Sequence, residues 1–207
     1  MTRETATGNI EMAQTSVNLK GLAQVDAAAK KSKGLPPVHL WNPPFCGDLD
    51  MRIASDGTWY YMGTPIGRKP LVRLFSTVLR HDEDGKYYLV TPVEKVGIIV
   101  DDAPFLAVQM HVEGEGVHQV ITFTTSVGDE ACVDDEHPLR FETEKVTDGL
   151  KPYVLVRGRL EALINRAVLY DLVALGCEHE VDGELRFGVW SSERFYPMAN
   201  AADLNQL

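Results

Sequence analysis

The chain has 207 residues, of which 44% are hydrophobic and 24% are charged, and its formal net charge is −10. These fractions are typical of a globular protein, and the length allows one large domain or two small ones. The acidic balance argues against polymeric nucleic acid or an anionic membrane as the main partner, because both require a broad basic surface. A local basic pocket for a small anion is compatible with it.

The cysteines and the N-terminal residues bear on the cellular compartment. Three widely spaced cysteines without a Cys-x-x-Cys motif are typical of reduced thiols rather than of a disulfide framework. Residues 1–18 contain no apolar run like that of a secretory signal, and no uninterrupted apolar stretch approaches the length of a membrane span. We therefore expect a cytoplasmic protein.

The first half of the chain predicts a tail followed by a small domain. Residues 1–36 are expected to form an N-terminal tail with a short helix and a linker. Two β-rich runs then flank Asp56-Gly57, a dipeptide typical of a tight hairpin. Apolar residues from Leu71 to Leu79 recur at helical spacing and predict one helix. Two further strand-like segments follow Asp84-Gly85.

The second half predicts more strands and a second helix. Residues 104–125 have the pattern of a hairpin that turns around Gly114 and Gly116, and residues 138–144 and 152–160 are typical of strands. Residues 164–176 predict a helix that ends at Gly176. Residues 184–190 form the last predicted strand.

The two helical segments are similar to each other at a constant offset of 98 residues. The matching pairs are Ile66 with Ile164, Arg68 with Arg166, Leu71 with Leu169, His81 with His179, and Gly85 with Gly183. We therefore predict an α+β fold of two related domains from an internal duplication, each with antiparallel strands and one main helix. The predicted domains span residues 37–102 and 103–198, and residues 199–207 form a C-terminal tail.

The segment GTPIGRKPL, residues 63–71, is a candidate anion site. It is not a phosphate-binding loop of the GxxxxGK[ST] type, because a proline stands where the hydroxyl residue belongs. Pro70 instead predicts a helix start, and neither Gly67, Arg68 nor Lys69 can cap it with a side-chain oxygen. Asn165 can cap the second helix. The open start attracts an anion by dipole and charge; the alternative is a helix start capped by water.

Basic residues accompany both helices and suggest a shared binding cleft. If the two units pack against each other, the two basic groups meet, and arginine geometry suits phosphate oxygens. The alternative is two ordinary solvated faces. The candidate ligand-binding residues are Arg68, Lys69 and Arg73 from the first unit and Arg157, Arg159 and Arg166 from the second.

Catalytic and metal-binding motifs give no comparable signal. The chain has no Gly-x-Ser-x-Gly or His-Glu-x-x-His motif. Cys177-Glu178-His179 lacks a second ligand pair at metal spacing, and Cys177 is expected to pack in the core at the helix end. The acidic pair Asp101-Asp102 is typical of a solvated loop. We predict neither catalytic nor metal-binding residues.

The motif string from PPFCGDLDMRIASDG to VGIIVDDAPF, together with YVLVRGRLEALINRAVLYDLV, resembles a bacterial family known as domain of unknown function 1285. The resemblance covers residues 36–198. It implies a duplicated core of two α+β domains, the second loosely similar to a pleckstrin-homology fold. It also implies a site at the domain interface for a nucleotide-like ligand, and a role in signal transduction.

Together, these observations predict a ligand-binding or regulatory protein that holds a phosphorylated or nucleotide-like anion between two domains. Two alternatives remain open: a protein-interaction module without a small ligand, and an enzyme that acts on a phosphorylated small molecule. The sequence defines neither a cofactor nor an oligomeric state.

Overall fold

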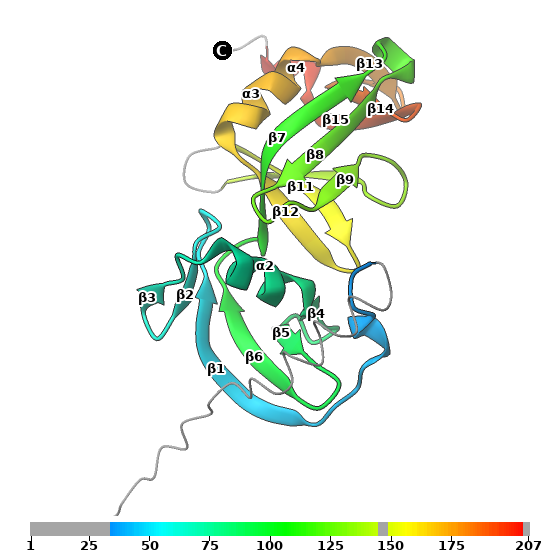
Figure 1. The fold of residues 1–207 in the computed structure, drawn as a ribbon. Helices are drawn as coiled ribbons and strands as arrows, with labels where there is room; N and C mark the ends of the chain where they lie inside the picture. The colour runs from blue at the N-terminus through cyan, green and yellow to red at the C-terminus, as the bar shows by residue number, and fades with distance from the viewer. Residues whose placement is uncertain (1–33, 145–148, 205–207) are drawn as a thin grey trace, which may run out of the picture.

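A computed structural model of the chain describes residues 34–144 and 149–204 (Figure 1). The chain forms two domains built mainly from curled β-sheet, each with one nine-residue α-helix, and the C-terminal domain also ends in the short helix α4 (Ala201–Leu204). The helix predicted within the N-terminal tail lies outside the described residues. No helix in the described part of the chain is long and apolar enough to cross a membrane.

The N-terminal domain is a six-stranded sheet in the order β3-β2-β1-β6-β5-β4. Its elements are η1 (Val38–Leu40), β1 (Phe45–Ile53), β2 (Trp59–Tyr61), β3 (Thr64–Pro65), α2 (Lys69–Thr77), β4 (Leu79–His81), β5 (Tyr87–Val90) and β6 (Lys95–Val100). The predicted hairpin at Asp56-Gly57 is confirmed: β1 pairs with β2, and Gly57 has a φ of +80°. β1 and β6 are parallel, unlike the antiparallel pairing predicted, because the long connection through α2 returns the chain to the same end of the sheet.

Helix α2 begins at Lys69, close to the predicted start at Pro70, but it ends earlier than its apolar stripe suggests. The hydroxyls of Ser76 and Thr77 donate hydrogen bonds to backbone carbonyls one turn earlier, at 2.8 and 2.7 Å. Such bonds compete with the helical pattern. Val78 and Leu79 are therefore buried outside the helix, and Leu79 starts β4.

The C-terminal domain contains a six-stranded sheet in the order β10-β11-β12-β7-β8-β9 and a three-stranded sheet in the order β13-β14-β15. Its elements are β7 (Phe105–Glu113), η2 (Gly116–His118), β8 (Val120–Thr125), β9 (Glu130–Cys132), β10 (Leu139–Thr143), β11 (Leu150–Arg157), β12 (Leu160–Ile164), α3 (Arg166–Ala174), β13 (Cys177–Val181), β14 (Glu184–Ser191), β15 (Arg194–Asn200) and α4 (Ala201–Leu204). β12 and β7 form a second parallel pair. Strands β13 and β15 were not predicted, and Cys177 is exposed on β13 rather than buried at a helix end.

The buried side chains of both domains form one continuous hydrophobic cluster. In the N-terminal domain the rings of Trp59 and Phe75 stack at 6.3 Å between centroids, which fixes α2 on its sheet. In the C-terminal domain Phe105 and Phe123 are almost fully buried. Because the cluster crosses the boundary, the two domains share a core as well as a linker.

The two helix starts differ as predicted. The side chain of Asn165 accepts a hydrogen bond of 2.8 Å from the backbone N–H of Val168 and caps α3. The residue that precedes α2 is Arg68, one position later than the 98-residue offset gives, and it makes no side-chain cap.

We expect Asn165→Ala to lower the free energy of unfolding by about 1 kcal/mol, because the substitution removes the oxygen that caps α3. Arg68→Ala is the matched control and should change it by much less. Urea unfolding followed by circular dichroism measures both values. Equal losses in the two variants would contradict the assigned cap.

Candidate functional site

The two domains meet at the carboxylate of Asp129, which forms ion pairs with one arginine from each domain. Arg73 comes from α2 and binds one carboxylate oxygen at 2.5 Å, while Arg157 comes from the end of β11 and binds the other. The Asp129 side chain is only 7% exposed. We call these three residues the junction triad.

Both arginines of the junction triad also donate to backbone carbonyls of the opposite domain. Arg73 reaches the carbonyl of Val127 at 2.5 Å, and Arg157 reaches that of Ser76 at 2.8 Å. The Arg157 guanidinium also lies 4.8 Å from the ring centre of Phe105, within range of a cation–π contact. The triad is therefore fixed by hydrogen bonds that run in both directions across the domain boundary.

The turn between β8 and β9 presents Asp129 to the two arginines. The backbone N–H of Asp129 donates to the hydroxyl of Thr125 at 2.9 Å, and its carbonyl accepts from the Thr125 N–H at 2.8 Å. Gly128 supplies the positive φ of +81° that closes the turn. This local bonding fixes the turn that carries the carboxylate independently of the two arginines.

A pocket of about 550 Å³ lies beside the triad, with walls from both domains. Leu79 and His81 of β4 line one wall, Arg159 and Leu160 of the β11–β12 hairpin line another, and the N-terminal segment 35–39 lines a third. We call it the junction pocket. Its volume is within the range of small-molecule sites, and it combines apolar side chains with a few polar groups.

Arg159 is the most accessible cation of the junction pocket. It forms a 2.9 Å ion pair with Glu83 across the boundary, but the side chains of Arg159 and Glu83 are 53% and 90% exposed. Its backbone carbonyl lies 3.1 Å from Nδ1 of His81, and since a carbonyl only accepts, that nitrogen carries the proton. The His81 ring stacks on Tyr87 at 4.3 Å.

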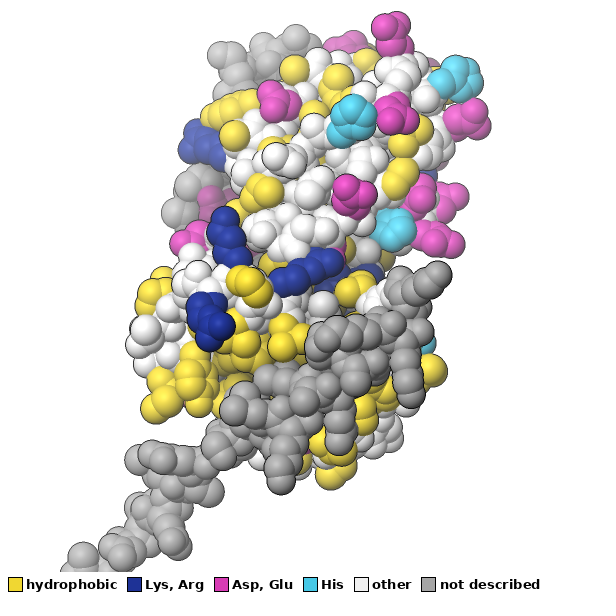
Figure 2. Space-filling view, in the orientation of Figure 1, with side chains coloured by type: hydrophobic (Ala, Val, Ile, Leu, Met, Phe, Trp, Pro, Cys, Tyr) yellow, Lys and Arg dark blue, Asp and Glu magenta, His cyan; other side chains and the backbone are white. Residues whose placement is uncertain are grey.

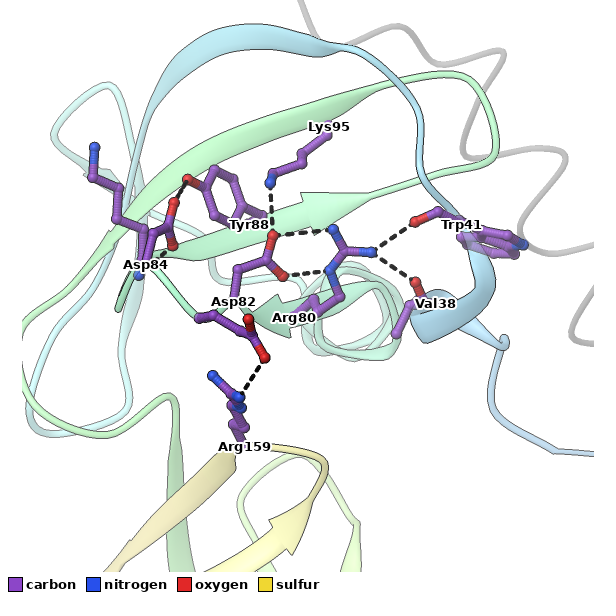
Figure 3. A network of polar contacts seen from close by, with 10 residues as sticks. Val38, Trp41, Arg80, Asp82, Asp84, Tyr88, Lys95 and Arg159 are labelled. Atoms are coloured by element: carbon purple, nitrogen blue, oxygen red, sulfur yellow. Dashed lines mark hydrogen bonds and ion pairs between the residues drawn. The ribbon is translucent and has the colours of Figure 1, made fainter.

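A polar network holds the N-terminal wall of the junction pocket in place (Figure 3). Arg80 donates to the backbone carbonyls of Val38 and Trp41 at 3.0 and 2.7 Å. It also pairs with Asp82, which accepts a second ion pair from Lys95 at 2.6 Å. Burial would raise the pKa of Asp82, but hydrogen bonds from Arg80 and Lys95 outweigh it, so the pKa lies below its ordinary value.

The other predicted binding residues are divided among separate places. Figure 2 shows several Lys and Arg side chains along the junction of the two halves. Lys69 lines a pocket of about 380 Å³ with Arg73, while Arg68 is exposed at the start of α2. Arg166 lines a third pocket near α3 and donates to the hydroxyl of Tyr170 at 2.9 Å. The structure thus brings Arg73, Arg157 and Arg159 to the junction and places Arg166 in another pocket.

The acidic pair Asp101-Asp102 lies in the linker between the domains, where each carboxylate has a different partner. Asp101 binds Arg52 of the N-terminal domain, whose hydrogen bond holds the pKa of Asp101 below its ordinary value. Asp102 binds Lys151 and the hydroxyl of Tyr153, both in the C-terminal domain. Burial and this hydrogen bond raise the pKa of Tyr153 to about 12.

By its fold and its junction, the chain is a protein of two curled, mainly stranded domains that are joined through a buried aspartate. Comparison with known proteins then supplies the family. Residues 36–103 match the "Domain of unknown function (DUF1285), N-terminal domain", and residues 104–198 match the "Protein of unknown function (DUF1285), C-terminal domain". The chain belongs to the DUF1285 family.

Two solved structures of the family are similar to this chain. A DUF1285 family protein from Silicibacter pomeroyi DSS-3 is 54% identical, with a TM-score of 0.79, over 89% of this chain and 97% of that one. A DUF1285 family protein from Shewanella baltica OS155 is 28% identical, with a TM-score of 0.50, over 61% of this chain and 92% of that one. No curated protein matches the chain.

Sequence reasoning missed Asp129, the residue that organises the junction. It follows a glycine turn in the segment TTSVGDE, a pattern typical of a solvated loop acid. Nothing in that pattern distinguishes it from the exposed acids of the chain, because its burial arises from contacts with residues 56 positions before it and 28 positions after it.

The double variant Arg73→Ala/Arg157→Ala should lower the free energy of unfolding by about 3–5 kcal/mol, because it leaves a buried carboxylate without partners. Urea unfolding measures the loss. Replacing all three triad residues by apolar ones, as in Arg73→Met/Asp129→Leu/Arg157→Met, should recover most of it. A loss below about 1 kcal/mol in the double variant would contradict the role of the triad.

The ion pairs of Asp82 predict a pH dependence of stability. Because its folded pKa is depressed, they stabilise the protein above the unfolded pKa of about 4 and are lost as the pH falls through the folded value. The stability difference between the natural protein and Asp82→Asn should therefore be largest near pH 7 and shrink below about pH 4. Unfolding at a series of pH values tests this. Asp135→Asn, at an exposed pair, serves as control, and a difference independent of pH would refute the prediction.

Proposed function

We propose that this chain is a small-ligand-binding regulatory protein, and that its ligand is an anion with an apolar part, such as a nucleotide, bound in the junction pocket. The observation that carries this proposal is a pocket of about 550 Å³ whose walls come from both domains and whose accessible cation is Arg159. Leu35, which is exposed, and Val38, which is half-buried, offer an apolar surface to the uncharged part of such a ligand.

Arg159, rather than the triad arginines, is the group proposed to bind the anion. Arg73 and Arg157 are both held in ion pairs with the buried Asp129, and breaking such a pair is costly. The pair of Arg159 with Glu83 is exposed, and exposed pairs contribute only about 0–1 kcal/mol. A phosphate group can therefore replace Glu83 at little cost and accept two hydrogen bonds from the guanidinium.

Occupancy of this pocket would be sensed by both domains. A ligand that touches β4 and the β11–β12 hairpin has a different affinity for each arrangement of the domains, and so shifts the population between them. This supports a role in signal transduction in the cytoplasm, where a change in domain arrangement would be the output.

We also propose that the two domains arose by internal duplication. Apart from the two-residue strand β3, which the second copy lacks, the order strand-strand-helix followed by a three-stranded meander occurs twice, as β1-β2-α2-β4-β5-β6 and as β11-β12-α3-β13-β14-β15. Gly85 and Gly183, which are 98 residues apart, both have positive φ in the equivalent turn. In the second copy the meander forms a separate sheet. The likeness of this domain to a pleckstrin-homology fold stays a prediction.

Thermal unfolding with adenosine and guanosine mono- and diphosphates tests the ligand site. We expect saturable stabilisation by at least one nucleotide, amounting to about 2.7 kcal/mol at one hundred times its dissociation constant. Inorganic phosphate, which lacks the apolar part, should have a smaller effect. Arg159→Ala should abolish the nucleotide effect.

Two control variants locate the ligand. Arg186→Ala removes a cation on β14 and should leave the nucleotide effect unchanged. Arg68→Ala/Lys69→Ala removes the cations at the start of α2 and should also leave it unchanged. If Arg68→Ala/Lys69→Ala lost the stabilisation by nucleotide and Arg159→Ala kept it, the ligand would bind at the start of α2 and the proposed site would be wrong. No effect with any nucleotide would overturn the proposal.

A further inference from the structure

Strand β13 is an edge strand with an exposed surface on both faces. It pairs with β14 on one side, and among the described strands no other borders it. In an antiparallel pair only alternate residues hydrogen bond to the neighbour, so the remaining N–H and C=O groups of β13 point outward. Four of its five residues, Cys177 to Glu180, are exposed.

The two faces of β13 differ in chemistry. On one face lie Glu178 and Glu180, beside Leu185 of β14, which is 52% exposed. Within the described residues, neither glutamate carboxylate has an ion pair or hydrogen bond. Unpaired charges on this face would attract cations directly opposite them in a neighbouring strand.

The other face carries an aromatic shelf made of His179, Trp190 and Phe195. The His179 ring lies 4.8 Å from Trp190 and 5.0 Å from Phe195, and the latter two rings are 5.3 Å apart. His179 is exposed and the other two are half-buried. Through His179, which Trp190 and Phe195 support from behind, the shelf offers contact area to an apolar side chain of a strand added beside β13.

Close packing of two phenylalanine rings on glycine backbone supports β13 from the side of β14 and β15. A Cβ at Gly176 would lie 2.0 Å from the ring of Phe187, so this ring packs directly on the backbone at the end of α3. A Cβ at Gly188 would lie 2.8 Å from the ring of Phe195, which therefore covers that glycine. A preformed edge reduces the ordering that a partner strand must undergo.

The glutamates also determine which partner fits. A two-fold antiparallel pairing of two copies centred on His179 would place Glu178 of one copy opposite Glu180 of the other, and like charges directly opposite destabilise a pair. The same charges favour a cationic strand. Repulsion of the wrong partner and attraction of the right one together give specificity.

We propose that β13 is a strand-addition site for an extended basic segment of a partner protein, in which cationic and apolar side chains alternate. The cationic side chains lie opposite Glu178 and Glu180, and an apolar side chain packs on His179, the ring of the aromatic shelf that is nearest to the free edge. Main-chain hydrogen bonds to the outward groups of β13 supply affinity, and the alternating side chains supply specificity. This site is independent of the junction pocket.

Titration of the full-length protein with the synthetic peptide TKVKVKT tests the proposal, with the peptide TEVEVET as the charge-reversed control. Nuclear magnetic resonance should show saturable shifts of the amide signals of residues 177–181, with slower hydrogen exchange at alternate amides. Raising the salt concentration should weaken binding, because the pairs are exposed. The acidic peptide should not bind.

Charge reversal on the protein makes the test decisive. Glu178→Lys/Glu180→Lys should weaken binding of the basic peptide by about tenfold or more and confer binding of the acidic peptide. Glu113→Lys/Glu115→Lys, which alters two exposed glutamates at the same spacing elsewhere, should leave binding unchanged. Equal binding of both peptides, absence of shifts on β13, or self-association through this edge in place of peptide binding would overturn the proposal.

Discussion

The charge of one buried carboxylate determines how the two domains fit together. Asp129 lies on a tightly bonded turn of the C-terminal domain and pairs with Arg73 from the N-terminal domain and Arg157 from its own. A buried carboxylate is tolerated only when it is paired and hydrogen bonded, so the domains must approach closely enough to supply both guanidinium groups. The junction pocket, the position of α2 and the exchange of backbone hydrogen bonds across the boundary all follow from that approach.

The junction triad gives two of the predicted ligand-binding arginines a structural role. Arginines from both domains do converge, but the anion between Arg73 and Arg157 is the side chain of Asp129 and not a bound ligand. A triad of two arginines and one aspartate retains one positive charge, and replacing a buried ion pair by well-packed apolar residues is often neutral or stabilising. The accessible Arg159 lies next to it, so a structural cation pair and a proposed ligand-binding cation occupy the same boundary with different degrees of exposure.

Local features of the fold were predictable from sequence, and features that depend on distant contacts were not. Asp56-Gly57 and Asn165 act within a few residues, through turn geometry and helix capping, and both were identified correctly. The end of α2 was misjudged because Val78 and Leu79 continue the apolar spacing, although Val78 only follows the helix and Leu79 begins β4. β13 was missed because exposed, charged edge strands lack the apolar alternation that identifies a strand. The burial of Asp129 has no local signature at all.

The continuous core has a consequence for synthesis on the ribosome. The chain emerges N-terminus first, so residues 34–103 are available to fold while the turn that carries Asp129 and the strand that carries Arg157 are still missing. Until then Arg73 lacks its acid, and the apolar residues of the N-terminal domain that face the boundary lack their cover. While the second domain is being translated, the first domain therefore exposes apolar surface and an unpaired arginine. The order of translation is thus part of how this protein reaches its fold.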